Sequence, residues 1–326
     1  MFAEAHNGDL RLIFRYSIDS QRPVSLPSKV VNAFHDIETE DPGETFPDRR
    51  AMRKEIWSSI HQVWEQCIAH PNIRASDAIV EMKEDPTGLV RSRVHHEPTM
   101  YQGYKASLLP LSQLLPGEDS RVQACTIIEY SNLDRLNHLP GRGTSTVVRL
   151  PSIADSLFVY KGIDFTTYLD SPTNFPQRRD MFYHEIKTVW SLPGHPNIIT
   201  PPQTLVVIGN VDDPREALLC GTLYPFLENG SLEDSMKAAK ESGVRIDIKN
   251  KMKWCYQMVS AILHTHRVAH TYHMDIKPGN MLLDSRKDLI LCDWEQYGAP
   301  LYTLAPEADG SWDVELEHSK AANEEP

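Results

Sequence analysis

An acid, an amide and a second acid stand at short intervals late in the sequence. Asn280 follows Asp275 by five residues (280 − 275 = 5), and Asp293 ends the apolar run Leu289–Cys292, which we expect to be a short buried strand. Because Pro278–Gly279 opposes a regular helix, we expect Asp275 and Asn280 on a loop. Two carboxylates and an amide can hold Mg²⁺, which proteins usually bind together with substrate phosphates. A remaining carboxylate can orient a hydroxyl group and accept its proton, so the pattern predicts phosphoryl transfer.

These residues resemble the catalytic signature of the eukaryotic protein kinase family, and the resemblance covers roughly residues 130–307. The family pattern H-R-D-x-K-x-x-N is present as HMDIKPGN at 273–280, and D-F-G is present as DWE at 293–295. The roles that the resemblance implies are catalytic base for Asp275, Mg²⁺ ligand for Asn280 and Asp293, and contact with the transferring phosphate for Lys277.

The resemblance also implies an ATP site, because further family motifs occur upstream in the family's order. Lys161 ends a predicted strand in FVYKG, where the family has the lysine that holds the α- and β-phosphates of ATP. Glu185, on the next predicted helix, corresponds to the glutamate that pairs with this lysine. Gly141 and Gly143 fit the family's glycine-rich loop, whose backbone N–H groups approach phosphates closely.

The adenine base of ATP needs apolar cover and a backbone edge. The stretch LLCGTLYPFLENGSLED resembles the family's hinge strand and the start of the helix after it. The base-binding positions that the resemblance implies are the side chains of Val148, Val159 and Leu282, the carbonyl group of Pro225 and the N–H group of Leu227.

The sequence departs from the family pattern at three places. Met274 replaces the arginine that pairs with a phosphorylated activation loop, so we do not expect that form of switching. Glu295 replaces the glycine of D-F-G, which stiffens the loop or adds a charge near the metal. Ala305–Glu307 resembles the A-P-E motif but comes only 14 residues after Asp293 (307 − 293 = 14), and little sequence follows it. We therefore expect an incomplete second lobe: either the chain is a fragment or variant, or residues 1–120 cover the exposed surface.

Three functions fit these motifs. The leading hypothesis is an ATP- and Mg²⁺-dependent Ser/Thr protein kinase that transfers phosphate to a hydroxyl group. The second is a small-molecule phosphotransferase similar to aminoglycoside or choline kinases, which share the H-x-D-x-x-x-x-N spacing and often have D-W-E. Lys277 and the stretch HPNII favour the protein kinase. The third is a pseudokinase that binds partners without turnover, although every metal and phosphate residue is retained.

Histidine and cysteine offer other metal chemistry. The histidines that could form a metal cluster are His264, His266, His270 and His273, although we expect His273 to be the structural histidine of the kinase family. The five cysteines are scattered without a CxxC pair, which gives little support to a zinc site and suits reduced thiols inside a cell.

Short strands and two helices must position these residues. The predicted strands from about residue 121 onward cover 126–130, 144–150, 156–163, 204–208 and 217–224, and the predicted helices lie near 178–192 and 251–264. A further helix is expected at 49–70. The predicted fold is α+β and two-lobed like a protein kinase, with a small β-rich N-lobe and an incomplete helical C-lobe. The predicted domains are a region of unknown fold at 1–120, a kinase-like domain at 121–312 (N-lobe 121–227, partial C-lobe 228–312) and an acidic tail at 313–326.

Composition narrows the class of protein. The chain has 326 residues, with 40% hydrophobic and 24% charged residues, as in soluble globular proteins. Its formal net charge of -12 opposes general binding to nucleic acid, whose phosphates attract basic surfaces. No apolar run is long enough to span a membrane, and no secretory signal is evident, so we expect an intracellular, cytoplasmic protein.

Overall fold

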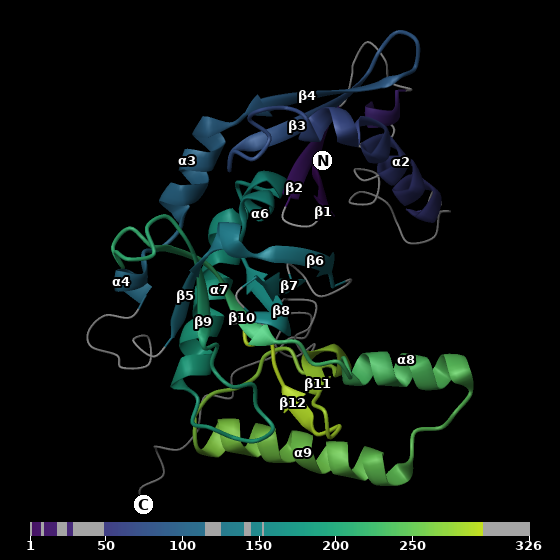
Figure 1. Cartoon of the computed structure of the whole chain (residues 1–326). Helices are drawn as coiled ribbons and strands as arrows, with labels where there is room; N and C mark the ends of the chain where they lie inside the picture. The colour runs from purple at the N-terminus through teal and green to yellow at the C-terminus, as the bar shows by residue number, and fades with distance from the viewer. Residues whose placement is uncertain are drawn as a thin grey trace, which may run out of the picture. The chain divides into compact units, whose positions relative to one another are not determined.

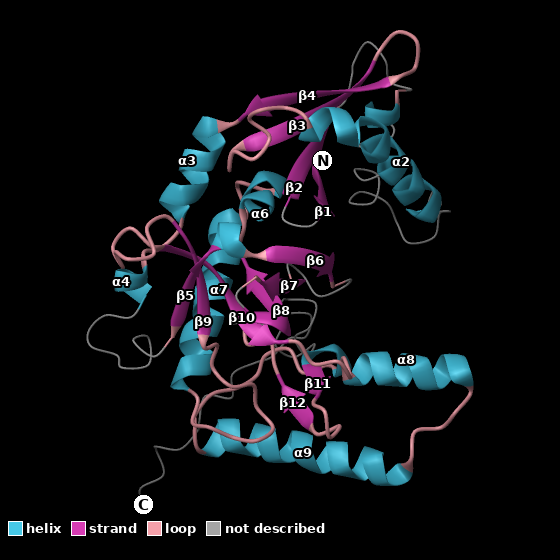
Figure 2. Cartoon of the chain, viewed as in Figure 1, coloured by secondary structure: helices cyan, strands magenta, loops and turns pink. Residues whose placement is uncertain are grey.

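The computed structural model describes residues 2–7, 10–17, 25–28, 49–114, 125–139, 145–151 and 153–295. The chain divides into two compact units, each with its own core (Figure 1). The first unit contains residues 1–182 and 202–226, and the second contains residues 183–201 and 227–326. Figure 2 shows that most strands belong to the first unit, whereas helices dominate the second. This segregation of strands and helices confirms the predicted α+β class.

A four-stranded sheet opens the first unit, with the strand order β1-β2-β3-β4. Its strands are β1 (Phe2–Asn7), β2 (Leu10–Tyr16), β3 (Ala78–Glu84) and β4 (Val90–His96). The pair β2–β3 is parallel, and the long helix α2 (Arg49–Ile68) lies in the connection between these two strands. The helix predicted at 49–70 is thereby confirmed.

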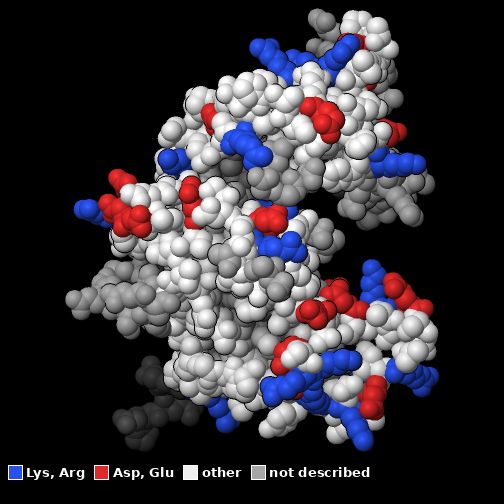
Figure 3. All heavy atoms as spheres, viewed as in Figure 1, with Lys and Arg blue, Asp and Glu red and all other residues white. Residues whose placement is uncertain are grey.

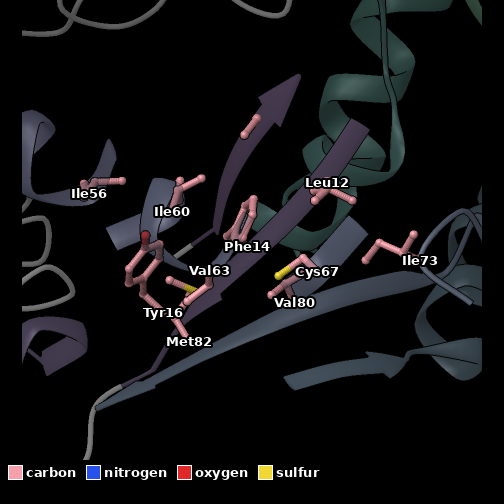
Figure 4. Packing of buried hydrophobic residues seen from close by; sticks show 11 residues of the cluster. Leu12, Phe14, Tyr16, Ile56, Ile60, Val63, Cys67, Ile73, Val80 and Met82 are labelled. Atoms are coloured by element: carbon pink, nitrogen blue, oxygen red, sulfur yellow. The ribbon is translucent and has the colours of Figure 1, made fainter. Parts of the chain in front are cut away.

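Alternating side chains of the sheet and one face of α2 form the core of this region. Leu12, Phe14 and Tyr16 lie two residues apart on β2, as do Val80 and Met82 on β3. Figure 4 shows these side chains gathered with those of α2. The helix contributes residues at steps of three and four, namely Ile56, Ile60, Val63 and Cys67. The two periodicities, two for strands and about 3.6 for the helix, bring the apolar faces together.

A six-stranded sheet forms the rest of the first unit, in the order β5-β9-β10-β8-β7-β6. Its strands are β5 (Thr126–Glu129), β6 (Asp134–His138), β7 (Thr146–Leu150), β8 (Ile153–Gly162), β9 (Thr204–Ile208) and β10 (Leu218–Pro225). Five of these strands confirm the five strands predicted from residue 121 onward, and β6 was not predicted. The central strand β10 is buried at six successive residues, 219–224, which explains its mostly apolar sequence.

Helices and one buried ion pair complete the first unit. The helices are α3 (Pro98–Ser107), α4 (Leu111–Leu114) and α6 (Phe165–Asp170), together with the 3₁₀ turn η1 (Tyr130–Asn132). Asp164 caps α6 by accepting a hydrogen bond from the backbone N–H of Thr167. Its second carboxylate oxygen accepts from Arg135 at 2.8 Å, and both side chains are 7% exposed. The pair therefore fixes β6 to the start of α6.

The second unit is built on two long helices and a small hairpin. Its elements are α8 (Leu232–Ser242), α9 (Ile248–Arg267), the 3₁₀ turn η2 (Pro278–Asn280), β11 (Met281–Leu283) and β12 (Leu289–Leu291). The helix α7 (Phe175–Ser191) begins in the first unit and ends in the second. The helices predicted near 178–192 and 251–264 are confirmed as α7 and α9.

Both α8 and α9 have clear sequence reasons for their positions. Ser231 and Asp234 form a reciprocal capping box at the start of α8, and Gly243 ends it with a φ of 69°. On α9, Trp254 and Ala261 pack into a core with Leu289 and Leu291 of β12. The indole N–H of Trp254 also donates to the carbonyl oxygen of Lys287 at 2.9 Å.

Neither a membrane helix nor a disulfide occurs among the described residues. No helix in this part of the chain combines the length and apolar character needed to cross a bilayer. All five cysteines are free thiols, and Cys255 alone among them is exposed.

Candidate functional site

The second unit holds the loop before Asp275 through two hydrogen bonds of His273, which is 7% exposed. Its Nδ1 accepts from the backbone N–H of Asp275 at 3.2 Å, and its Nε2 lies 2.9 Å from the carbonyl oxygen of Cys292. Because Nδ1 accepts, the proton of the neutral ring is on Nε2, which donates to Cys292. The ring also meets Trp294 edge to face, with a centroid separation of 4.6 Å. His273 thus ties the loop to the segment that leads into Asp293.

The side chain of Asn280 restrains Asp275 through two hydrogen bonds. Its Nδ2 group donates both to the backbone oxygen and to Oδ2 of Asp275, each at 2.9 Å. Its backbone oxygen accepts from the N–H of Cys292 at 3.0 Å. Among the described residues, none donates a hydrogen bond to the Oδ1 atom of Asn280. The amide group is therefore oriented with its oxygen available to a cation.

Lys277 places a positive charge at the carboxylate of Asp275. Its ammonium group donates a hydrogen bond to Oδ2 of Asp275. This hydrogen bond is the main cause that raises the pKa of Lys277, with partial burial acting against it. The negative charges of Asp275, Asp293 and Glu295 raise that pKa further. Lys277 is therefore protonated at neutral pH, in a field produced by three carboxylates.

Asp293 follows the strand β12, as the sequence predicts. The strand pairs with β11 on one side, and Leu291 forms a parallel bridge with Ile198 on the other. Asp293 itself has a φ of 74°, in the left-handed region that residues with a Cβ rarely adopt. The strand thus fixes the position of the Asp293 backbone, and the left-handed backbone conformation determines the direction in which the Asp293 side chain leaves it.

Three carboxylates gather at this point of the second unit. Oxygen atoms of Glu185, Asp293 and Glu295 all lie within 4.8 Å of one another, and Glu185 is 4% exposed. Close carboxylates repel one another unless a cation or a proton compensates their charge. Hard oxygen donors of this kind, with the amide oxygen of Asn280 available, fit a Mg²⁺ ion. Glu295 was not predicted as a metal ligand, although its acidic side chain two residues after Asp293 was a signal in the sequence.

The first unit contains Lys161, on β8, and strand pairing decides which side chains share its face. Val159 lies two residues before Lys161, and both therefore point to the same side of the sheet. Val159 is paired with Val147 of β7, whereas Val148 is paired with Phe158. Directly paired residues share a face, so Val148 points to the opposite side from Lys161. This corrects the expectation that Val148 and Val159 cover the same base: Val147 is the valine on that face.

The remaining predicted base-binding residues lie on β10, on the loop after it and on β11. Pro225 is the last residue of β10, is exposed and is paired with Phe158. The carbonyl group of Leu227 accepts a hydrogen bond from Gly230 at 3.0 Å. Within the described part of the chain, the N–H group of Leu227 donates to no other residue. Leu282 is half-buried in the middle of β11.

Some predicted features lie outside the described residues. They are Gly141 and Gly143 of the glycine-rich loop, the A-P-E-like stretch Ala305–Glu307 and the tail at 313–326.

The histidines do not assemble as metal ligands. The ring of His264 contacts that of His195 at a centroid distance of 4.8 Å, and the ring of His266 contacts that of Tyr272 at 4.5 Å. In the part of the chain that the structure describes, the one group of three or more candidate ligands contains carboxylates only. This leaves the rival hypothesis of a histidine metal cluster without support.

Comparison with known proteins matches this arrangement to one family. Residues 141–297 match the family model of the protein kinase domain. This range contains Lys161, Glu185, Asp275 and Asp293, so the match includes the elements that carry the predicted site.

Curated relatives point to the same family. The mitogen-activated protein kinase kinase kinase mom-4 of Caenorhabditis elegans is 28% identical over 196 residues, which are 55% of this chain and 33% of the relative. The probable serine/threonine-protein kinase FMP48 of Saccharomyces cerevisiae is 32% identical over 112 residues, 34% of this chain and 29% of the relative. The chain thus spans about a third or less of the length of these two relatives. The match to the family model therefore identifies residues 141–297, just under half of the chain, as protein kinase-like.

Proposed function

We propose that this chain is an ATP- and Mg²⁺-dependent kinase that phosphorylates serine or threonine hydroxyl groups of proteins. The observation that carries the proposal is the set of contacts around Asp275, whose carboxylate is held by Lys277 and Asn280. A general base must be fixed within hydrogen-bonding reach of the proton that it accepts. These two neighbours restrain Asp275, and its side chain remains 29% exposed to an incoming hydroxyl group.

The proposed chemistry divides between the loop and the strand. Asp275 orients the acceptor hydroxyl and takes its proton, and Lys277 balances the negative charge of the phosphate in transfer. Asn280 and Asp293 are the proposed Mg²⁺ ligands, and a bound ion would neutralise charge on the phosphates of ATP. Glu295 adds a carboxylate within 4.8 Å of that of Asp293, so we propose that it also contacts the ion or its water ligands.

The proposed nucleotide contacts follow the family resemblance, with one change. Lys161 would hold the phosphates and Glu185 would orient it, as the corresponding family residues do. The side chains proposed to cover the base are Val147, Val159 and Leu282, with Val147 in place of Val148 because of the strand register. The carbonyl group of Pro225 and the N–H group of Leu227 are the proposed hydrogen-bonding partners of the adenine edge. A proline is compatible with position 225 because only its carbonyl group is needed there, and proline has no N–H group.

A small-molecule phosphotransferase is the second candidate function, since the sequence Asp293-Trp294-Glu295 also occurs in such enzymes. The ammonium group of Lys277 at the proposed base favours the protein kinase. The two functions differ in the acceptor, which an experiment can distinguish directly.

The test offers MgATP to the full chain with two sets of acceptors: serine- and threonine-containing peptides, and small alcohols such as choline and aminoglycosides. We expect transfer to peptides, and we expect Asp275→Asn to lower kcat by about 10²–10⁴-fold with little change in ATP affinity. The control is Asp212→Asn, which removes an exposed carboxylate from a loop of the first unit and leaves activity unchanged.

Two results would contradict the proposal. Transfer to small alcohols alone would establish the second function. A folded protein that transfers no phosphate and whose Tm does not rise with MgATP would be a binding module without turnover.

A further inference from the structure

The helix α9 exposes an apolar stripe along most of its length. The stripe residues are between 45% and 76% exposed: Ile248, Met252, Tyr256, Val259 and Leu263. They recur at steps of three and four, so they lie on one face of the helix. The opposite face is already used, because Trp254 and Ala261 pack against the hairpin of β11 and β12. A contiguous exposed apolar face of this kind marks an interaction surface.

Positive charge accompanies the stripe. The helix contains Lys249, Lys251, Lys253 and Arg267 and no acidic residue. Lys253 pairs with Asp288 at 2.9 Å. Within the described residues, Lys249, Lys251 and Arg267 form no ion pair. Figure 3 shows Lys and Arg side chains over the region of α9. The surface therefore suits an occupant that is both apolar and acidic.

A segment that belongs to the same unit as α9 has that composition. Residues 309–317 read DGSWDVELE and contain four acidic residues, no basic residue and the apolar side chains of Trp312, Val314 and Leu316. Trp312 lies 17 positions after the last described residue, Glu295 (312 − 295 = 17). An extended chain spans at most ~3.3–3.6 Å per residue, so this connection reaches roughly 56–61 Å. A helix of 20 residues such as α9 is only about 30 Å long.

We propose that residues 309–317 of this chain dock on the stripe of α9. Trp312, Val314 and Leu316 cover apolar side chains of the stripe, and the acidic residues meet Lys249, Lys251 and Arg267. Because the segment is tethered to the same unit of the chain, its local concentration is high without a strong intrinsic affinity. The proposal is independent of whether the kinase-like domain transfers phosphate.

The chain contains its own probe of this surface. Cys255 is the only exposed cysteine of the five, and it lies on α9 three residues after Met252 and four before Val259. Residues at these spacings are neighbours on a helix surface. A docked segment therefore shields the thiol of Cys255 from alkylation, and pulse alkylation with N-ethylmaleimide followed by peptide mass spectrometry measures that shielding at this cysteine alone.

Two pairs of variants test the charges on each side. Asp313→Asn with Glu315→Gln removes acidic charge from the segment, and the control is Glu324→Gln with Glu325→Gln, which removes equal charge outside it. Lys249→Gln with Lys251→Gln removes basic charge beside the stripe, and the control is Lys237→Gln with Lys240→Gln on the exposed surface of α8. We expect alkylation of Cys255 to be about tenfold faster in both test variants, which corresponds to about 1.4 kcal/mol of docking free energy. Both controls should react at the wild-type rate.

A measurement on the wild-type protein at high salt gives a test that does not depend on the folding of a variant. In about 1 M sodium chloride, where charges are screened within ~3 Å, the wild-type thiol should also react faster. The proposal is overturned if wild-type Cys255 reacts as fast as the same cysteine in an unfolded peptide, or if the test variants react like their controls. It is also overturned if protection of Cys255 increases with protein concentration, because a second copy of the chain then covers the stripe.

Discussion

The Nε2–H group of His273 donates a hydrogen bond to the carbonyl oxygen of Cys292 at 2.9 Å. This bond joins the loop of Asp275 to the segment that leads to Asp293, although His273 and Cys292 are 19 positions apart in the sequence. The two carboxylates that the sequence assigns to proton transfer and metal binding therefore share one rigid support.

Replacing His273 should break the connection between the loop of Asp275 and the segment that leads to Asp293. We expect His273→Ala to lower the free energy of unfolding by about 1–3 kcal/mol, because buried partners of two hydrogen bonds are left unpaired. Kinase activity should fall by more than stability explains, since Asp275 loses its orientation. Denaturant unfolding and kcat measure the two effects. His266→Ala, at an exposed position, is the control, and equal behaviour of the two variants would contradict this role.

Asp288 gives a pH-dependent prediction. Hydrogen bonds from Lys253 and then Gln257 lower the pKa of Asp288 below its usual value. A group whose pKa is lower in the folded state stabilises the fold above its unfolded pKa, about 3.9 for aspartate, and this contribution is lost as the pH falls through the folded pKa. The Tm of the wild type should thus exceed that of Asp288→Asn at neutral pH, and the difference should shrink below about pH 4. A difference that stays constant down to pH 2 would contradict the assignment.

The strand register separates two adjacent valines. Val148 is fully buried on the face away from Lys161, whereas Val147 is 6% exposed on the face of Lys161. We expect Val148→Ala to cost about 2 kcal/mol of stability through lost burial, with little change in ATP affinity. Val147→Ala should weaken ATP binding by about tenfold, the effect of a small loss of apolar contact in a pocket. Calorimetric titration with ATP and thermal unfolding measure the two quantities, and weaker ATP binding in Val148→Ala alone would contradict the proposed face.

The buried pair Arg135–Asp164 predicts a large stability effect away from the site. Arg135→Met removes the charge that balances Asp164, whose side chain is only 7% exposed. Breaking a buried ion pair from one side costs about 3–5 kcal/mol, because an unpaired charge remains in the interior. The exposed residue Arg215, whose side chain is 83% exposed beside Asp213, is the control, and Arg215→Met should change stability by less than about 1 kcal/mol. Urea unfolding of the two variants checks the contrast.

Local sequence predicted the loop at 273–280 and several strands of the first unit well, for physical reasons. The strands β9 and β10 are mostly apolar because their residues are buried on both faces, and such stretches are easily recognised. Asp275 and Asn280 are five residues apart, so the turn at 278–280 alone brings them into contact. Short-range geometry of this kind is encoded within a few residues.

Features that depend on distant pairing were missed. Strand β4 reads VRSRVHH, with few apolar residues, because it lies at the edge of its sheet and much of it faces solvent. The parallel pairing of β2 with β3 joins residues that are more than 60 positions apart, which no local pattern reveals. The choice between Val147 and Val148 likewise depends on the register between two strands, since a one-residue shift moves every side chain to the other face.

The left-handed backbone at residue 293 also constrains how this position can evolve. Glycine adopts a φ of 74° without strain, and asparagine and aspartate are the other residues that tolerate it most readily. Of these three, only aspartate brings a negatively charged oxygen ligand. The backbone conformation and the proposed metal-binding role therefore leave a single residue type that satisfies both, so even a conservative exchange to glutamate would meet a conformational barrier.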